Sequence, residues 1–362
     1  MGIGTSIKRF FVGDTKKTVS HSIPSRHNRL DASRTTDENK KHWAEADGLS
    51  PTAQLTPDVR KKLRDRARYE CQNNSYAAGL IRTLVADTIG GGPRLQMLMD
   101  DDNLNETIES LWNDWALATN LALSFRIMAG VRYVAGESFA VFRDSKRLEN
   151  MGFPVTLDLR LIDPAQVASP YGQAFLGPTS DDGIDCDEEG EVVSYKILKA
   201  HPGDNRLFNR PLNADTVLAD NVLHWYQPEW PGQLRGYTPL APSLPIFAQL
   251  RRFTSATLTA AEVAAMLAGI MESDLPPDAN GVGLNQSDWF DTVELVRGTL
   301  LTLPSGMKAS QFKPEQPTTN YDMFINAKLR ELGRSLNVPF GKMAGDHSNY
   351  NYSSGRLDDG PY

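Results

Sequence analysis

The acidic side chains between residues 181 and 191 are the densest group in the sequence that could do chemistry. Clustered carboxylates can hold a divalent cation, and a bound cation can activate water for hydrolysis. The segment from Asp185 to Lys196 begins like a calcium-binding loop, with Gly190 at its sixth place, but Lys196 stands where the bidentate Glu is required. The pattern therefore favours an exposed acidic hairpin over a cation site. Its carboxylates are Asp181, Asp182, Asp185, Asp187, Glu188, Glu189 and Glu191.

Other partial motifs do not complete a site. The glycines at 90–92 could cradle a phosphate at the start of a helix, but here they follow a predicted helix, and no Lys-Ser or Lys-Thr comes after them at Walker spacing. Residues 305–308 have the Ser-x-x-Lys spacing of serine acyl-transfer enzymes, but neither Ser-Asp-Asn nor Lys-Thr-Gly follows. The six His residues form no His-x-x-x-His pair. These patterns predict neither an enzyme nor a cofactor.

The strongest basic cluster lies between residues 60 and 68. It consists of Arg60, Lys61, Lys62, Arg64, Arg66 and Arg68. One interpretation is a patch that faces DNA or a partner, and the other is the solvated or subunit-facing side of an amphipathic helix. The second is favoured, because acids at positions 58, 65 and 70 interrupt the bases.

The overall charge limits how this chain can bind nucleic acid. Its 362 residues include 38 Lys and Arg against 45 Asp and Glu, which gives a net charge of -7. A protein that grips DNA by neutralising phosphates needs a surplus of bases on the contact face, so any DNA contact is predicted to be loose or local. With 40% hydrophobic residues, the chain should be globular.

Compartment signals are few. Cys71 and Cys186 lie far apart with no second Cys or His at ligand spacing, which fits a reducing cytoplasm and predicts no structural zinc. The first residues contain no apolar stretch of signal-peptide length, and the chain has no uncharged apolar run of about 18 residues. Neither secretion nor a membrane span is predicted.

Helix signals dominate the sequence from residue 56 to residue 135. Thr56, Pro57 and Asp58 supply a cap, a first-turn proline and a first-turn acid. Apolar residues recur at i, i+3 and i+4 farther on, and glycines stop two of the helices. The predicted helices cover about residues 56–71, 77–85, 102–115 and 121–135.

Alternating segments and a long helix follow. Period-two patterns at residues 138–143, 155–161, 192–198 and 222–226 predict a mostly antiparallel sheet. An Ala-, Leu- and Thr-rich helix is expected over about 243–271, and another over about 321–336, with a Pro- and Gly-rich excursion between them. This order predicts an α+β fold.

Six short segments, taken in order, resemble one known family. They are residues 66–93 with an Arg-x-Arg and a Gly-rich stop, the Gly-Glu-aromatic entry at 136–139, the Leu-Ile-Asp-Pro stretch and acidic hairpin within 161–197, Gly-Gln-Leu-Arg-Gly at 232–236, Leu-Ala-Pro at 240–242, and the Asn-Tyr-Ser-Ser-x-Arg loop ending at Arg356. The family is the portal proteins of lambda-type tailed bacteriophages. The matches extend from about Arg66 to Arg356.

The resemblance implies a division of the chain into four regions. Residues 1–55 would form a flexible N-terminal arm, and 56–242 a wing of helices and antiparallel sheet. Residues 243–336 would form long stem helices with a clip at about 275–317. Residues 337–362 would form a tunnel loop and a C-terminal end.

Function and partners follow from the same resemblance. Family members form a closed homomeric ring, expected here to be dodecameric, at the unique capsid vertex through which DNA is packaged and ejected. Double-stranded DNA would pass through without sequence preference. The terminase large subunit, head-tail connector proteins, and capsid and scaffold proteins would dock on the ring, with no membrane involved. The protein would be assembled in the bacterial host cytoplasm and would belong to the virion, as the product of a phage or prophage.

The resemblance also suggests site residues. The loop facing DNA would comprise Asp346, His347, Ser348, Asn349, Tyr350, Asn351, Tyr352 and Arg356. A structural turn packing on a neighbouring subunit is the alternative for the central residues of this loop. Gln233, Arg235 and Gly236 are candidates for the subunit interface, with Arg235 bridging to a carboxylate of the adjacent subunit.

One departure from the family and one rival function remain. Family members continue with a further helical section after the Tyr-Ser-Ser-x-Arg loop, whereas this sequence ends in a polar stub at residues 357–362, so it is expected to be truncated. The rival function is a soluble metal-dependent nuclease or hydrolase that uses the acidic region at 181–191.

Overall fold

The computed structural model describes most of the chain in several stretches. These are residues 37, 40–44, 46, 48–169, 180–204, 213–266, 270–273, 307–310, 318–348 and 350–360. The chain divides into two compact units, Met1–Leu49 and Ser50–Tyr362, and the second contains the elements below. Most of the predicted arm and of the predicted clip lies outside the described residues.

Helices α1 to α3 begin where side chains can cap them. Ser50, Thr56 and Asn74 each accept a hydrogen bond from a backbone N–H in the first turn of the helix that follows. Gly90, with φ +54°, ends the third helix, at the glycine run that predicted the stop. The bounds are α1 Pro51–Gln54, α2 Pro57–Asn73 and α3 Ser75–Ile89.

Helices α4 (Asp102–Ala118) and α5 (Leu121–Ala135) differ in how they pack. α5 buries Leu121, Met128 and Ala129. α4 buries no side chain fully, and Leu111 in its predicted apolar stripe is 47% exposed. The helical period was therefore predicted correctly for α4, but within one chain its stripe does not enter a core.

The first sheet is antiparallel, with the strand order β2-β1-β7. Its strands are β1 Glu137–Asp144, β2 Leu157–Ile162 and β7 Val222–Tyr226. The short helix α6 (Lys146–Asn150) follows β1, and the 3₁₀ helix η2 (Pro164–Gln166) follows β2. Helix α5 leads directly into β1 through Gly136, whose φ is +92°.

The second sheet is also antiparallel, in the order β3-β4-β5-β6. Its strands are β3 Ser180–Asp181, β4 Ile184–Cys186, β5 Val192–Leu198 and β6 Ala214–Leu218, with η5 (Ala219–Asn221) before β7. A buried cluster joins the two sheets, with Phe139 from the first and Ile184 and Tyr195 from the second. The predicted antiparallel sheet is therefore present as two smaller sheets.

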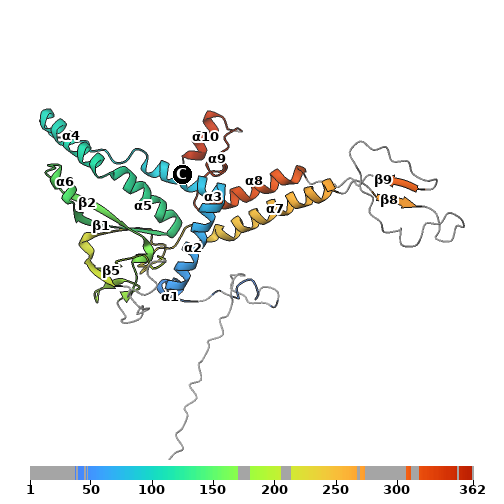
Figure 1. Ribbon diagram of the computed structural model, residues 1–362, viewed down its shortest axis with the longest axis horizontal. Coiled ribbons are helices and arrows are strands. Elements are labelled where there is room, and N and C mark those ends of the chain that lie inside the picture. Colours follow the sequence, from blue (N-terminus) through green and yellow to red (C-terminus); the bar gives the residue numbers. More distant parts are fainter. Residues whose placement is uncertain are drawn as a thin grey trace, which may run out of the picture. The chain divides into compact units, whose positions relative to one another are not determined.

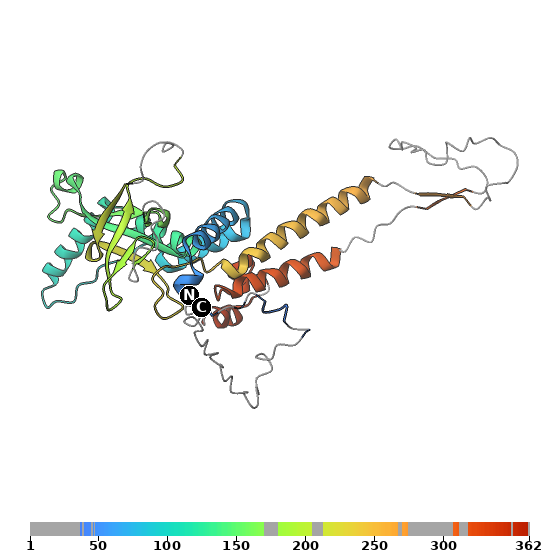
Figure 2. The ribbon, with the colours of Figure 1, turned by 90° about the horizontal axis from the view of Figure 1, so that it is seen from below.

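Two long helices run side by side after η6 (Ala241–Ser243), as Figures 1 and 2 show. They are α7 Leu244–Met266 and α8 Thr318–Arg334. The Phe253 ring contacts the rings of Tyr321 and Phe324, with centroids 5.7 and 4.1 Å away. A two-stranded sheet, β8 Ile270–Ser273 and β9 Met307–Ser310, lies between these helices in sequence.

The chain continues with two short helices, α9 Phe340–Ala344 and α10 Tyr352–Asp359. Buried residues of α9 and α8 share one core with α2, α3 and the start of α7. Leu80, Leu240, Phe247 and Leu332 are each 1% exposed or less in that core. The α+β class is confirmed, and none of the described helices has both the length and the apolar character needed to cross a bilayer.

Candidate functional site

A buried ion pair between Glu137 and Arg235 lies at the centre of the described polar contacts. Arg235 Nη2 donates to Glu137 Oε1 at 2.6 Å, and Arg235 Nε donates to both carboxylate oxygens at 3.1 and 3.0 Å. Glu137 is 1% exposed and Arg235 2%. Glu137 also accepts from the backbone N–H of Gly236 at 2.9 Å. The pair thus fastens the first residue of β1 to the loop after β7, 98 residues later.

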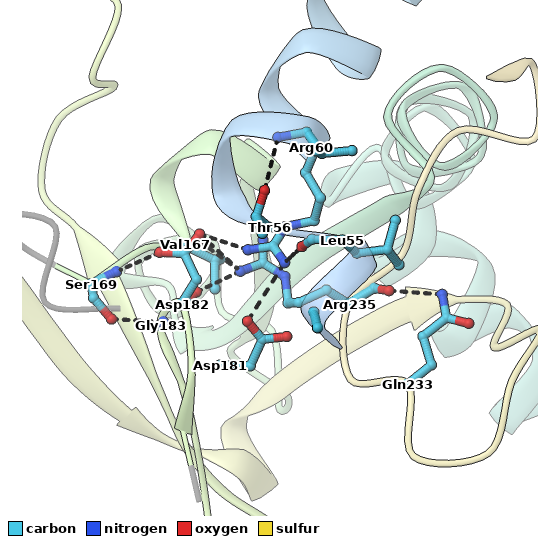
Figure 3. A network of polar contacts seen from close by, with 12 residues as sticks. Leu55, Thr56, Arg60, Val167, Ser169, Asp181, Asp182, Gly183, Gln233 and Arg235 are labelled. Atoms are coloured by element: carbon cyan, nitrogen blue, oxygen red, sulfur yellow. Dashed lines mark hydrogen bonds and ion pairs between the residues drawn. The ribbon is translucent and has the colours of Figure 1, made fainter. Parts of the chain in front are cut away.

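The same arginine holds the turn between β3 and β4 (Figure 3). Arg235 Nη1 donates to the backbone oxygens of Val167 at 3.1 Å and Asp182 at 2.5 Å. Asp182 has a positive φ of 33°, and its carboxylate accepts from the backbone N–H of Ser169 at 3.1 Å. Beside it, Gly183 at φ +90° approaches Ala168 too closely for a Cβ. One guanidinium therefore orients three separate backbone segments.

Helix α2 joins this network through Arg60. Its Nη2 lies 2.7 Å from Asp182 Oδ2, its Nη1 lies 3.5 Å from Asp181 Oδ1, and Nη1 also donates to the Leu55 carbonyl at 2.5 Å. Burial lowers the pKa of Arg60, as does the nearby positive charge of Arg235. Burial raises the pKa of Asp181, against the opposing effect of Arg60. Ion pairing and hydrogen bonding offset the cost of burying these charges.

His224 completes the centre on the sheet side. Its ring stacks between Phe139 and Tyr226, with both centroid distances 4.2 Å, and its Nε2 lies 3.3 Å from Glu137 Oε2. Burial lowers the pKa of His224, although the bond to Glu137 opposes this. Burial alone would raise the pKa of Glu137, but Arg235 and the bond from His224 hold it well below its ordinary value. Glu137 is therefore an ionised structural carboxylate.

Gln233 organises the loop after β7. Its Oε1 accepts from the backbone N–H groups of Glu229 and Trp230 at 2.9 and 3.3 Å, and its Nε2 donates to the Arg235 carbonyl at 2.8 Å. The hydroxyl of Tyr226 donates to the Gln233 carbonyl at 2.9 Å. A single buried amide side chain thus fixes the path of the chain from β7 to Arg235.

The sequence selected Gln233, Arg235 and Gly236 for a different reason, a contact between subunits. The structure brings all three together inside one chain, where each is buried and the carboxylate that Arg235 meets is Glu137 of the same chain. A single chain does not test whether a second copy also touches them, so the subunit contact stays a prediction. Glu137 was missed as a functional residue, and its only signal was its place in the Gly-Glu-aromatic segment.

The C-terminal segment has the opposite character. Asn351 Oδ1 accepts from the Ser354 N–H at 2.8 Å, and the Asn351 N–H donates to Ser354 Oγ at 3.0 Å, which is a capping box at the start of α10. Two residues of the Asn-Tyr-Ser-Ser-x-Arg motif therefore start a helix. Of the other three, Tyr352 (84% exposed) and Arg356 are exposed one turn apart.

The remaining residues of the predicted DNA-facing loop lie between α9 and α10. Asp346, His347 and Ser348 are exposed, and the rings of His347 and Tyr350 contact each other with centroids 5.6 Å apart. Asn349 lies outside the described residues. Gly341 in α9 has no room for a Cβ, which would lie 2.7 Å from His347 Nδ1. Two of the eight predicted residues, Tyr352 and Arg356, are therefore in α10, and the other described ones lie in the connection between α9 and α10.

The acidic region gives no support to the nuclease alternative. Asp181 and Asp182 face Arg60, and Asp185 is paired with Lys196 at 2.8 Å. The Asp187 carboxylate accepts from the backbone N–H of Glu191 within the β4–β5 turn. Within the described stretches, no group of three His, Cys, Asp or Glu side chains could hold a metal ion. The carboxylates that belong to the network stabilise the fold.

Comparisons with known proteins agree with one another. The family described as phage portal protein, lambda family, matches residues 36–358. A "Probable portal protein" of Halomonas phage phiHAP-1 is 24% identical over 322 residues, which cover 82% of this chain and 61% of that protein. The chain therefore spans less than two thirds of the length of this relative.

Solved structures share the fold at low identity. A chain from the neck of an empty gene transfer agent particle, computed with C6 symmetry, superposes with a TM-score of 0.54 at 14% identity, covering 85% of this chain and 75% of the other. A chain from the virion of the native particle gives a TM-score of 0.52 at 12% identity, with 81% and 73% covered. A chain from the native neck computed with C12 symmetry gives 0.50 at 12%, with 84% and 75% covered.

Proposed function

The chain belongs to the lambda family of phage portal proteins, and on that basis we propose that it is one subunit of a closed homo-oligomeric ring at the unique vertex of a capsid, through which DNA is packaged and ejected. The observation that carries the proposal is the family match over residues 36–358, which includes both the buried network and the C-terminal segment. The relative named as a probable portal protein supports it.

A ring is the form of assembly that we propose. Two of the solved structures with this fold come from necks computed with C12 and C6 symmetry, and a dodecamer satisfies both. A ring of identical chains needs two different complementary surfaces on each copy. Its place would be in the virion, because a chain from the virion of the native gene transfer agent particle has a similar fold.

Each region of the chain would have a different role in the ring. Residues 56–242, which carry the two sheets and the network, would be a wing that holds its shape during DNA transport. The pair α7 and α8 would be the stem beside the channel, and the segment at about 275–317 the clip that meets terminase and connector proteins. Docking of capsid and scaffold proteins on the outer surface belongs to the same proposal.

The C-terminal segment would face the DNA. Its exposed side chains include the ring of Tyr352, the imidazole of His347 and both signs of charge in Asp346 and Arg356. Such a mixture can make transient contacts with phosphates without the large release of counterions that accompanies tight binding. The net charge of -7 agrees with a conduit that lets the duplex slide. No catalytic step is assigned to this chain.

The shape of the purified assembly tests the proposal. Negative-stain electron microscopy of the 362-residue chain should show closed rings with a central opening, and native mass spectrometry should give one dominant stoichiometry. Duplex DNA should bind weakly, with a shallow dependence on salt and no preferred sequence. Monomers at all accessible concentrations, or a steep salt dependence that indicates many phosphate contacts, would contradict it.

A further inference from the structure

Three arginines lie on one side of α2, four residues apart, and the middle one has no ion-pair partner among the described residues. Arg60 is paired with Asp182 at 2.7 Å, and Arg68 with Asp163 at 2.5 Å. Arg64 makes no ion pair with the residues that the structure describes, and its Nε is buried without a hydrogen-bond partner. Buried polar atoms are rarely left in this state in a complete assembly.

The charges and burial around Arg64 favour an ion pair between its guanidinium and a carboxylate from another molecule. Burial lowers its pKa, and the positive charge of Arg68 lowers it further, against the pull of Asp163 and Glu137. The exposed Lys61 lies three residues before Arg64 and so on the same side of the helix. A carboxylate that reached this position would pair with a guanidinium that has already lost much of its water.

The β4–β5 turn carries acids of the kind this position would attract. Asp187 and Gly190, at φ +90°, fix the turn, because the Asp187 carboxylate and carbonyl accept from Glu191 and Gly190. Glu188 and Glu189 between them are exposed, and no basic partner is described for either. The turn therefore presents two neighbouring carboxylates on a short, hydrogen-bonded support.

The acidic turn and the residue that ties its hairpin to α2 lie at opposite ends of one short strand. Strand β4 begins just after Asp182, which pairs with Arg60 of α2, and it ends at the acidic turn. A second copy placed next to it could receive the turn on its own α2, which is the head-to-tail geometry that closes a ring.

We propose that Glu188 and Glu189 of one copy dock on Lys61 and Arg64 of the next, and that this contact forms part of the interface between subunits. The inference rests on the proposed function, which supplies the ring, and adds the surfaces that meet in it. Paired charges of this kind set register and partner choice as well as affinity.

A double-mutant cycle on the assembling protein tests the contact. The variants are Arg64→Gln, the pair Glu188→Gln with Glu189→Gln, and all three changes together. Arg64→Gln and the double variant of Glu188 and Glu189 should each raise the concentration needed for half-assembly by about tenfold. If the residues contact one another, the triple variant should also raise it by about tenfold, whereas independent effects would multiply to about a hundredfold. Arg66→Gln on the same helix and Glu149→Gln on α6, both exposed, are the controls and should leave assembly unchanged.

A stability measurement separates this role from a merely structural one. Arg64→Gln removes a partly buried cation without an ion pair, so the midpoint of unfolding of the unassembled chain should stay the same or rise while assembly weakens. A fall in both would indicate a structural role for Arg64 and would overturn the inference.

The remaining outcomes are distinct. Wild-type rings with unchanged assembly of Arg64→Gln would overturn the interface and leave the proposed function intact, as would additive effects in the cycle. A loss of duplex DNA binding in Arg64→Gln with intact rings would assign Arg64 to DNA instead. A wild-type chain that stays monomeric would overturn the proposed function, and the interface with it.

Discussion

The buried network around Arg235 and the C-terminal segment from 337 to 360 use similar residue types for opposite purposes. In the network, the guanidinium of Arg235 meets Glu137 and three backbone carbonyls, and it is 2% exposed. In the C-terminal segment, Arg356 and Tyr352 project from α10 into solvent. The same chemistry stabilises a fold in one place and remains available for a partner in the other.

The two regions differ in whether their charged and polar side chains already have partners within the chain. Around Arg235, the described carboxylates within ion-pair distance are those of Glu137 and Asp182, and both also accept hydrogen bonds from the backbone. In α10, Asn351 and Ser354 start the helix and Asp359 lies 3.7 Å from Lys342 Nζ, while the side chains of Tyr352 and Arg356 are exposed. A substitution should therefore change folding in the network and change assembly or transport in the C-terminal segment.

The largest effect is expected from Glu137→Ala. Removing one partner of a buried pair leaves Arg235 charged and unpaired, which should lower the free energy of unfolding by about 3 to 5 kcal/mol. Denaturant unfolding followed by circular dichroism measures this. The control is Lys199→Ala, whose ion pair with Asp215 has both side chains more than half exposed and should cost less than about 1 kcal/mol. Equal losses in both variants would contradict the distinction between the two pairs.

A somewhat smaller loss is expected from Gly136→Ala. This glycine has φ +92°, and an added Cβ would lie 2.0 Å from the backbone carbonyl carbon of Tyr237. Strain and overpacking together should lower the free energy of unfolding by about 2 to 3 kcal/mol. The matched change is Gly355→Ala in α10, where nothing lies near the added atom, and thermal unfolding should show a neutral or slightly raised midpoint there.

The free energy of unfolding should depend on pH because of two residues in the network, His224 and Glu137, and this change should be smaller than those caused by the substitutions above. The folded state lowers the pKa of both His224 and Glu137, so both bind fewer protons folded than unfolded. Stability is then fully present above about pH 6.5 and falls as pH drops, first through the window of His224 and then, below about pH 4.3, through that of Glu137.

The variant His224→Gln isolates the upper window. Its free energy of unfolding should be flatter than that of the wild type from about pH 6.5 downward, and the loss below about pH 4.3 should remain. Urea unfolding across pH 4 to 8 gives both curves. Parallel curves through the upper window would show that His224 carries no part of the pH dependence.

The smallest effects on stability are expected in the C-terminal segment. Tyr352→Ala and Arg356→Ala remove exposed side chains and should change the free energy of unfolding by less than about 0.5 kcal/mol. If the segment faces the channel, the same variants should weaken duplex binding by assembled rings in a filter-binding assay. A large loss of stability would instead place these side chains in a packed contact.

The sequence alone determined the local elements of this protein. A cap at Thr56 and glycines at 90 and 136 place helix ends within a few residues, because those signals act through hydrogen bonds and φ angles of adjacent residues. Period-two patterns predicted β1, β5 and β7, because successive side chains of a strand point to opposite faces of the sheet. The family was also visible, since its motifs are short and contiguous.

Only the tertiary structure decided which residues meet. Glu137 and Arg235 are 98 residues apart, and nothing in either local sequence shows that one neutralises the other. The stripe on α4 has the spacing of a buried face, yet none of its side chains is fully buried. Arg60 and Arg64 belong to one basic run, but among the described residues only Arg60 has an ion-pair partner. Periodicity reports which side chains share a face, but burial and ion pairing depend on which distant segment covers that face, and that is fixed only when the chain folds.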